Sequence, residues 1–157
     1  MALKGEKDYP FIGDTVVSSD GVEKPDKDYL KITNEYVDKN NTSKWTRLSR
    51  ASYAVGALAR FNNNHKLLRP EAAKIAENLK LKPVCHNPFM NNAAQLVESF
   101  HIAYEMIRLI DELINSPMAE TVVPVKPKAG EGVGIVEAPG AFYFTIMRTI
   151  KTGALKR

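Results

Sequence analysis

The chain has 157 residues, a length typical of one domain with a single core. Its hydrophobic fraction of 44% and charged fraction of 25% are close to the averages of globular chains, which excludes a collagen-like or disordered protein. The net charge of +4 arises from basic residues interleaved with acidic ones rather than from one basic block, which argues against a nucleic-acid-binding protein.

The first residues of the sequence do not resemble a targeting signal. Lys4, Glu6 and Lys7 leave no apolar segment after Met1, and no stretch of 18 apolar residues occurs in the sequence. We therefore expect a cytoplasmic protein without a membrane partner. The single Cys85 excludes an intrachain disulfide and is compatible with a reducing compartment.

Residues 8–33 predict a short β unit, either a hairpin or a meander. Residues 15–17 form an apolar run, Asp20 and Gly21 supply a turn, and residues 29–33 alternate. The polar, asparagine-rich stretch that follows, over residues 38–44, predicts a loop.

Two helices are predicted in the middle of the chain. Gly56 is expected to separate an extended segment from a first helix that reaches about residue 65. Pro70 opens a second helix, because proline at the first helical position costs no hydrogen bond, and Pro83 ends it.

The strongest periodicity in the sequence predicts a long helix over about 88–116. Asn87 can cap this helix and Pro88 can open it. A helix of this length needs other elements to cover its apolar face, so we expect it to be the backbone of the core. The apolar residues that recur every three to four positions are Phe89, Ala93, Leu96, Phe100, Ala103, Ile107, Ile110 and Ile114.

A glycine-flanked strand is predicted over residues 133–138. The glycine-rich segment 130–134 leads into this strand and not into a helix, so it does not predict a phosphate-binding loop. The expected fold class is therefore mainly α with a small β portion (α+β).

Metal-binding residues are scarce in the sequence. Cys85 and His86 form an adjacent pair of soft ligands, but zinc or nickel would need two or more further Cys or His ligands at short spacing. We therefore interpret Cys85 as a small buried thiol beside a helix cap.

The long helix carries acidic residues that could act together. Glu98, Glu105 and Glu112 repeat every seven positions, and we interpret them as a solvated face rather than an acid/base array. His101 lies three positions after Glu98, which predicts a surface pair.

The segment 52–62, Ser-Tyr-Ala-Val-Gly-Ala-Leu-Ala-Arg-Phe-Asn, resembles the Tyr-x-Val-Gly-Ala-Leu-Ala-Arg-x-Asn segment of nickel-iron hydrogenase large subunits. Residues 87–101, and the approach to a Glu-Ala-Pro-Arg-Gly motif at 132–139, resemble that family in the same order. The sequence of these segments is similar to that of the cytosolic branch of the family, whose members pass electrons to a nicotinamide or deazaflavin coenzyme through partner subunits. The matching motif residues are Val55, Gly56, Leu58, Ala59, Arg60, Asn62, Glu137 and Ala138.

The resemblance implies that residues 1–139 are the central part of a hydrogenase large-subunit-like domain, and thus a truncated member of an oxidoreductase family. The parent family catalyses reversible dihydrogen oxidation at a nickel-iron centre held by two Cys-x-x-Cys pairs, and this sequence has neither pair. The motif arginine is also missing, because Gly140 follows Pro139, which is a remnant of the pocket around the metals. We expect no catalytic residue, no metal ligand, no cofactor and no catalysis from this chain alone.

Residues 140–157 depart from the family, and we interpret them as an out-of-frame translation. One permitted back-translation with a single C restored gives Pro-Arg-Gly-Val-Leu-Phe-His-His-Tyr, which recovers the missing arginine and a histidine pair expected at this point.

A helical interaction module is the alternative to an inactive hydrogenase fragment. Such a module would bind a hydrogenase small subunit, a maturation factor or another copy of itself, through faces that the family buries. An unrelated helical protein is the third interpretation.

Overall fold

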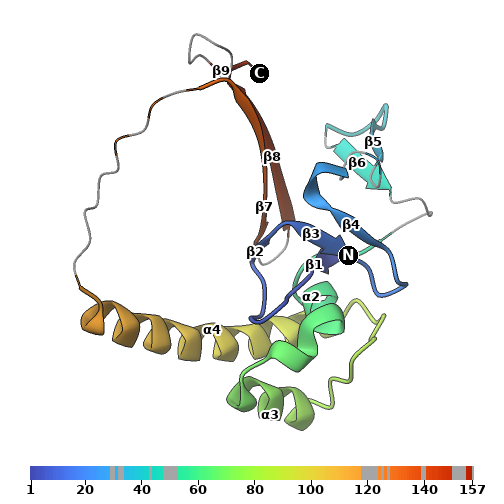
Figure 1. Ribbon diagram of the computed structural model, residues 1–157. Coiled ribbons are helices and arrows are strands. Elements are labelled where there is room, and N and C mark those ends of the chain that lie inside the picture. The colour runs from blue at the N-terminus through green and yellow to red at the C-terminus, as the bar shows by residue number, and fades with distance from the viewer. Residues whose placement is uncertain are drawn as a thin grey trace.

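The computed structural model describes residues 1–28, 31, 34–42, 44–47, 53–117, 124, 126, 128–138, 141–149 and 155–156. Figure 1 shows a long helix, α4, beneath a group of small sheets, with α2 between α4 and the N-terminal strands. The α+β class is confirmed, although the β portion is larger than the sequence predicted. The helices are α2 (Ala57–Asn64), α3 (Pro70–Asn78) and α4 (Met90–Asn115).

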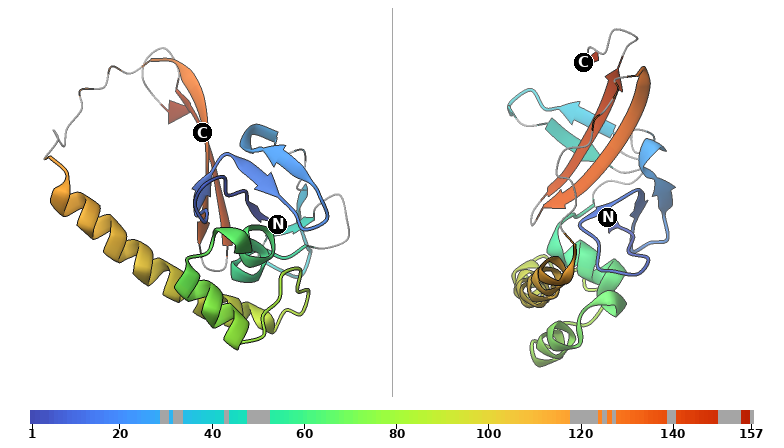
Figure 2. Two further views of the ribbon diagram at one scale, coloured as in Figure 1. Left: turned by 60° about the horizontal axis from the view of Figure 1, so that its bottom comes forward. Right: turned by 60° about the vertical axis from the view of Figure 1, so that its left-hand side comes forward.

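Three antiparallel sheets are found among the described residues, with strand orders β1-β3-β4, β2-β7-β8-β9 and β5-β6. Figure 2 shows β7 and β8 as a long two-stranded ribbon that rises away from the helices. The strands are β1 (Ala2–Leu3), β2 (Ile12–Gly13), β3 (Thr15–Val17), β4 (Glu23–Pro25), β5 (Asn34–Val37), β6 (Lys44–Arg47), β7 (Gly130–Ala138), β8 (Ala141–Thr149) and β9 (Leu155–Lys156).

The predicted local β structure is largely confirmed. β3 and β4 pair as a hairpin, and its turn contains Gly21 with φ +92°, a value that glycine adopts without steric cost. The polar stretch predicted as a loop connects β5 to β6, and the predicted strand before Ala138 is β7. The alternating stretch 29–33 falls mostly outside the described residues.

The end of α3 differs from the prediction. α2 follows Gly56 and α3 begins at Pro70, as expected. α3 does not extend to Pro83, because Lys80 adopts a positive φ of 54° and the N–H of Leu81 bonds to the carbonyl of Ala76 at 2.9 Å. This left-handed turn closes the helix before the proline.

The start of α4 is offset from the prediction by two residues. The side chain of Asn87 accepts a hydrogen bond from the N–H of Phe89 at 3.1 Å, and the helix proper begins at Met90. The asparagine therefore caps the turn that leads into α4 rather than α4 itself.

The face of α4 that packs against the protein is not the predicted apolar stripe. Its buried residues are Ala94, Val97, Glu98 and His101, whereas the stripe residues Phe89 and Ile107 are 84% and 58% exposed. From Ile102 onwards the apolar side chains of α4 lie largely in solvent. Only the first half of α4 therefore contributes to the core.

Two buried clusters form the core of the described residues. One joins α2, α3 and the first half of α4 through Ala57, Phe61, Ala72 and Val97. The other joins the N-terminal strands to β7 through Met1, Leu3, Val16 and Ile135. None of the helices in the described part of the chain has the length and apolar character needed to span a bilayer.

Candidate functional site: a buried arginine and two carboxylates

The first turn of α2 is shaped by residues of the matched motif. Gly56 lies at φ 93° and ψ −166°, a backbone conformation that side chains rarely tolerate. The N–H of Leu58 is accepted by the side chain of Asn91 from α4 at 3.1 Å, which satisfies a donor at the start of the helix. Ala57 of α2 and Ala94 of α4 are both fully buried in one apolar cluster, and Arg60, three residues after Ala57, is fully buried as well.

Arg60 is completely buried and is held by Glu98 of α4. Nε of Arg60 donates to Oε1 of Glu98 at 2.7 Å, and Nη2 donates to Oε2 at 2.7 Å, so the pair is bidentate. The hydroxyl of Tyr9 donates to the same Oε1 at 2.8 Å, and the guanidinium lies 5.5 Å from the ring centroid of Phe11. Glu98 is therefore fully engaged by an arginine and a tyrosine.

The third nitrogen of Arg60 reaches the end of β7. Nη1 donates to the backbone carbonyl of Ala138 at 3.0 Å and to Oε2 of Glu137 at 3.2 Å. The other oxygen of Glu137 accepts the N–H of Leu3 in β1 at 2.8 Å. One guanidinium thus joins α2, α4 and β7, and Glu137 extends the link to β1.

The buried network has unusual electrostatics, because one guanidinium faces two carboxyl groups. Burial raises the pKa of Glu137 to about 7, although Arg60 and the N–H of Leu3 act in the opposite direction. Burial also opposes the charge of Arg60, but the hydrogen bonds and charge of Glu98 outweigh it and raise the pKa of Arg60. Burial and the charge of Glu98 raise the pKa of Tyr9, which keeps its hydroxyl a donor.

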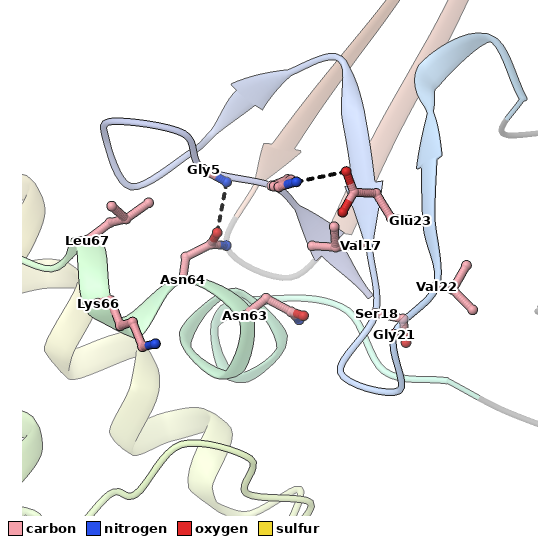
Figure 3. Close-up of a pocket in the computed structure, with 11 residues that line it drawn as sticks. Gly5, Val17, Ser18, Gly21, Val22, Glu23, Asn63, Asn64, Lys66 and Leu67 are labelled. Carbon is pink, nitrogen blue, oxygen red and sulfur yellow. Dashed lines mark hydrogen bonds and ion pairs between the residues drawn. The ribbon is translucent and has the colours of Figure 1, made fainter.

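Two asparagines of α2 fix neighbouring loops. The amide of Asn62 donates to the carbonyl of Cys85 at 2.8 Å and accepts its N–H at 3.0 Å. Asn64 binds the carbonyl of Leu3 at 2.9 Å and the N–H of Gly5 at 2.8 Å, the latter visible beside a cavity of about 380 Å³ in Figure 3. Both contacts hold backbone rather than a ligand.

The interpretation of the acidic face of α4 is wrong for its first member. Glu98 is buried and paired, Glu105 is half-buried between Arg69 and Arg108, and only Glu112 is well exposed. The helix turns its Glu98 side toward α2, where Arg60 neutralises the carboxylate.

The predicted surface pair of His101 and Glu98 is also wrong. His101 is buried, its Nδ1 accepts the N–H of Arg69 at 3.2 Å, and its ring lies 5.0 Å from that of Tyr9. Burial lowers the pKa of His101, consistent with a neutral ring that accepts a backbone hydrogen bond.

The residues of this chain do not fit a nickel-iron centre. Cys85 is the one cysteine in the sequence, and its thiol is half-buried against the helical core. Within the described ranges, no group of three or more His, Cys, Asp or Glu side chains could hold a metal ion. A thiolate-bridged pair of metals needs several cysteine ligands, and this sequence has one.

The structure brings together three of the motif residues, Arg60, Glu137 and Ala138. Val55 packs against the N-terminal cluster, whereas Gly56, Leu58, Ala59 and Asn62 shape α2 and its surroundings. Pro139 lies outside the described residues. Tyr9 and the buried role of Glu98 were not predicted from the sequence. The helical spacing of positions 94, 97, 98 and 101 is the signal that could have indicated the burial of Glu98.

Comparison with known proteins identifies two similar chains, both from Pyrococcus furiosus. Sulfhydrogenase 1 subunit alpha is 33% identical over 140 residues, which cover 88% of this chain and 33% of that protein. Sulfhydrogenase 2 subunit alpha is 31% identical over 85 residues, which cover 54% of this chain and 21% of that protein. No family model matches the chain, which spans a third or less of either relative. Over most of its length the chain is therefore hydrogenase-like in sequence.

Proposed function

We propose that this chain is a framework segment of the nickel-iron hydrogenase large-subunit type, from the cytosolic branch, and that it is inactive by itself. The observation that carries the proposal is the contact between Arg60 of the first motif and Glu137 and Ala138 of the second. Arg60 lies 77 and 78 positions before Glu137 and Ala138, in a different motif of the resemblance, and the three residues meet at one buried point. The similarity to two sulfhydrogenase alpha subunits supports the same assignment.

The framework role follows from what the network holds. Arg60 binds the carbonyl of Ala138. In the hydrogenase large subunits that this sequence resembles, the residues that follow this position form the wall of the metal pocket. Metal chemistry would need thiolates that this sequence lacks. The chain therefore supplies support for a pocket and no ligand or catalytic group of its own.

Metal analysis and a dihydrogen assay test this proposal together. The purified chain is expected to contain no stoichiometric nickel or iron and to show no dihydrogen-dependent reduction of a viologen dye. An intact sulfhydrogenase measured in parallel serves as the positive control. Close to one nickel per chain, or dye reduction that depends on dihydrogen, would contradict the proposal.

A non-catalytic interaction module is the second candidate, and the exposed half of α4 favours it. Ile107, Leu113 and Ile114 are 58%, 75% and 75% exposed, and apolar surface of this extent is typical of a contact with another polypeptide. The proposed partners are a hydrogenase small subunit, a maturation factor or a second copy of the chain.

Light scattering and co-purification test the interaction module. The chain is expected to self-associate or to co-purify with a hydrogenase small subunit or maturation factor, and L113K together with I114K is expected to abolish this. K74E on the exposed side of α3 is the matched control. A strict monomer at high concentration that captures neither partner would rule out the module.

A further inference from the structure

The buried network contains more negative than positive ionisable groups. Arg60 contributes one positive charge, whereas Glu98 and Glu137 would contribute two negative charges, and the side chains of Arg60 and Glu137 are fully buried. The other cation that faces Glu137, the amino group of Met1, donates to the carbonyl of Ala54 at 2.7 Å, and burial lowers its pKa, so it compensates the second carboxylate poorly. A poorly compensated charge is costly in such surroundings, which favours uptake of a proton by one carboxyl group.

The hydrogen bonds identify which carboxyl holds that proton. Glu98 receives two guanidinium contacts at 2.7 Å and the hydroxyl of Tyr9, so its charge is compensated on both oxygens. Glu137 receives the uncharged N–H of Leu3 on Oε1 at 2.8 Å and one guanidinium contact on Oε2, at 3.2 Å, from a nitrogen that also binds the carbonyl of Ala138. The weaker contact favours Glu137 as the protonated group.

We propose that Glu137 is a buried proton-binding site, and that Arg60 couples its occupancy to the hold on the Ala138 carbonyl. The groups that face it are Arg60 from α2, Glu98 from α4, and the amino group of Met1, with Tyr9 acting through Glu98. The proposal does not depend on the relation to hydrogenases, because it rests on burial and on the three nitrogens of one guanidinium.

Protonation of Glu137 changes which acceptor Nη1 of Arg60 binds more strongly. With the proton in place, Glu137 is neutral and Nη1 binds chiefly the Ala138 carbonyl, at 3.0 Å. Nη1 has one N–H for each acceptor, but when the proton leaves, the ionised carboxylate attracts this nitrogen more strongly, which moves it toward Glu137 and lengthens its bond to the carbonyl. The end of β7 is thereby held more firmly in the protonated state. The raised pKa of Glu137, about 7, places this exchange near neutral pH.

Infrared difference spectroscopy during a pH titration tests the site directly. Wild type is expected to show the carbonyl stretch of one buried carboxylic acid that disappears near neutral pH. E137Q is expected to lack this band, and E77Q, which changes an exposed glutamate of α3, is expected to retain it. Absence of the band in wild type, or its persistence in a folded E137Q, would overturn the proposal.

E98Q provides a second, independent test should E137Q fail to fold. When the charge of Glu98 is removed, Glu137 is the one carboxylate left to pair with Arg60. The pH at which half of the infrared band is lost is therefore expected to fall by about one unit or more. An unchanged midpoint contradicts the assignment. The coupling is tested by NMR of the Arg60 guanidinium, whose Nη signals are expected to shift with the same midpoint; signals that do not respond would refute it.

Discussion

Replacing Glu137 with glutamine is expected to remove one component of the pH dependence of stability. Burial raises the pKa of Glu137 from 4.5 to about 7 in the folded chain, so between these values the folded state binds a proton that the unfolded state has released. The stabilisation is complete below about pH 4.5 and is lost as the pH rises through 7. A difference of about 2.5 units corresponds to about 3 kcal/mol of unfolding free energy, since one unit is worth about 1.4 kcal/mol.

Urea unfolding followed by circular dichroism, repeated across this pH range, measures the effect. Relative to E137Q, wild type is expected to lose about 3 kcal/mol of unfolding free energy between about pH 4.5 and about pH 8. Because other groups titrate in both proteins, the informative quantity is the difference between the two profiles. E77Q is the matched control and should follow wild type. Parallel profiles for wild type and E137Q would refute the reasoning.

Three further predictions follow from particular residues. R60K is expected to lower the unfolding free energy by about 3–5 kcal/mol, because an ammonium cannot satisfy two carboxyl groups and a carbonyl in fork geometry; denaturant unfolding within 1 kcal/mol of wild type would contradict this. G56A is expected to cost about 1–3 kcal/mol, since φ is 93° there, and an unchanged melting temperature would disprove it. Sequencing of the source DNA is expected to reveal, after the codon of Pro139, a second frame that encodes Pro-Arg-Gly and a later Cys-x-x-Cys pair; its absence from every frame would eliminate the frameshift.

Local features of the sequence predicted the elements well. The start of α2 after Gly56, the start of α3 at Pro70 and the position of α4 were predicted from signals within a few residues of each element. Such signals suffice because backbone conformation and helical spacing are set by near neighbours. The buried face of α4 was not predictable in this way. It contains Glu98 and His101, and a rule that places polar residues outside fails where distant groups neutralise them.

The buried network could be predicted only in part for the same reason. Arg60 and Glu137 were identified as motif residues by resemblance, but nothing in their spacing indicated that they meet. Tyr9 and Leu3 come from segments without a recognisable motif, and they bind at separations of 89 and 134 residues. Partners this far apart become visible only when the chain is folded.

The network at Arg60 joins α2, α4 and β7 and reaches β1 through Glu137, and this junction affects how the chain folds. Its contacts join α2 to partners 38, 77 and 78 residues later in the sequence, so closing it requires large loops to be ordered first. Helices α2 and α4, whose bidentate pair spans 38 residues, are expected to associate before β7 joins through the contacts that span 77 and 78 residues. The contacts of Arg60 with β7 therefore form late in folding, and substitutions at Glu137 should accelerate unfolding more than they slow folding.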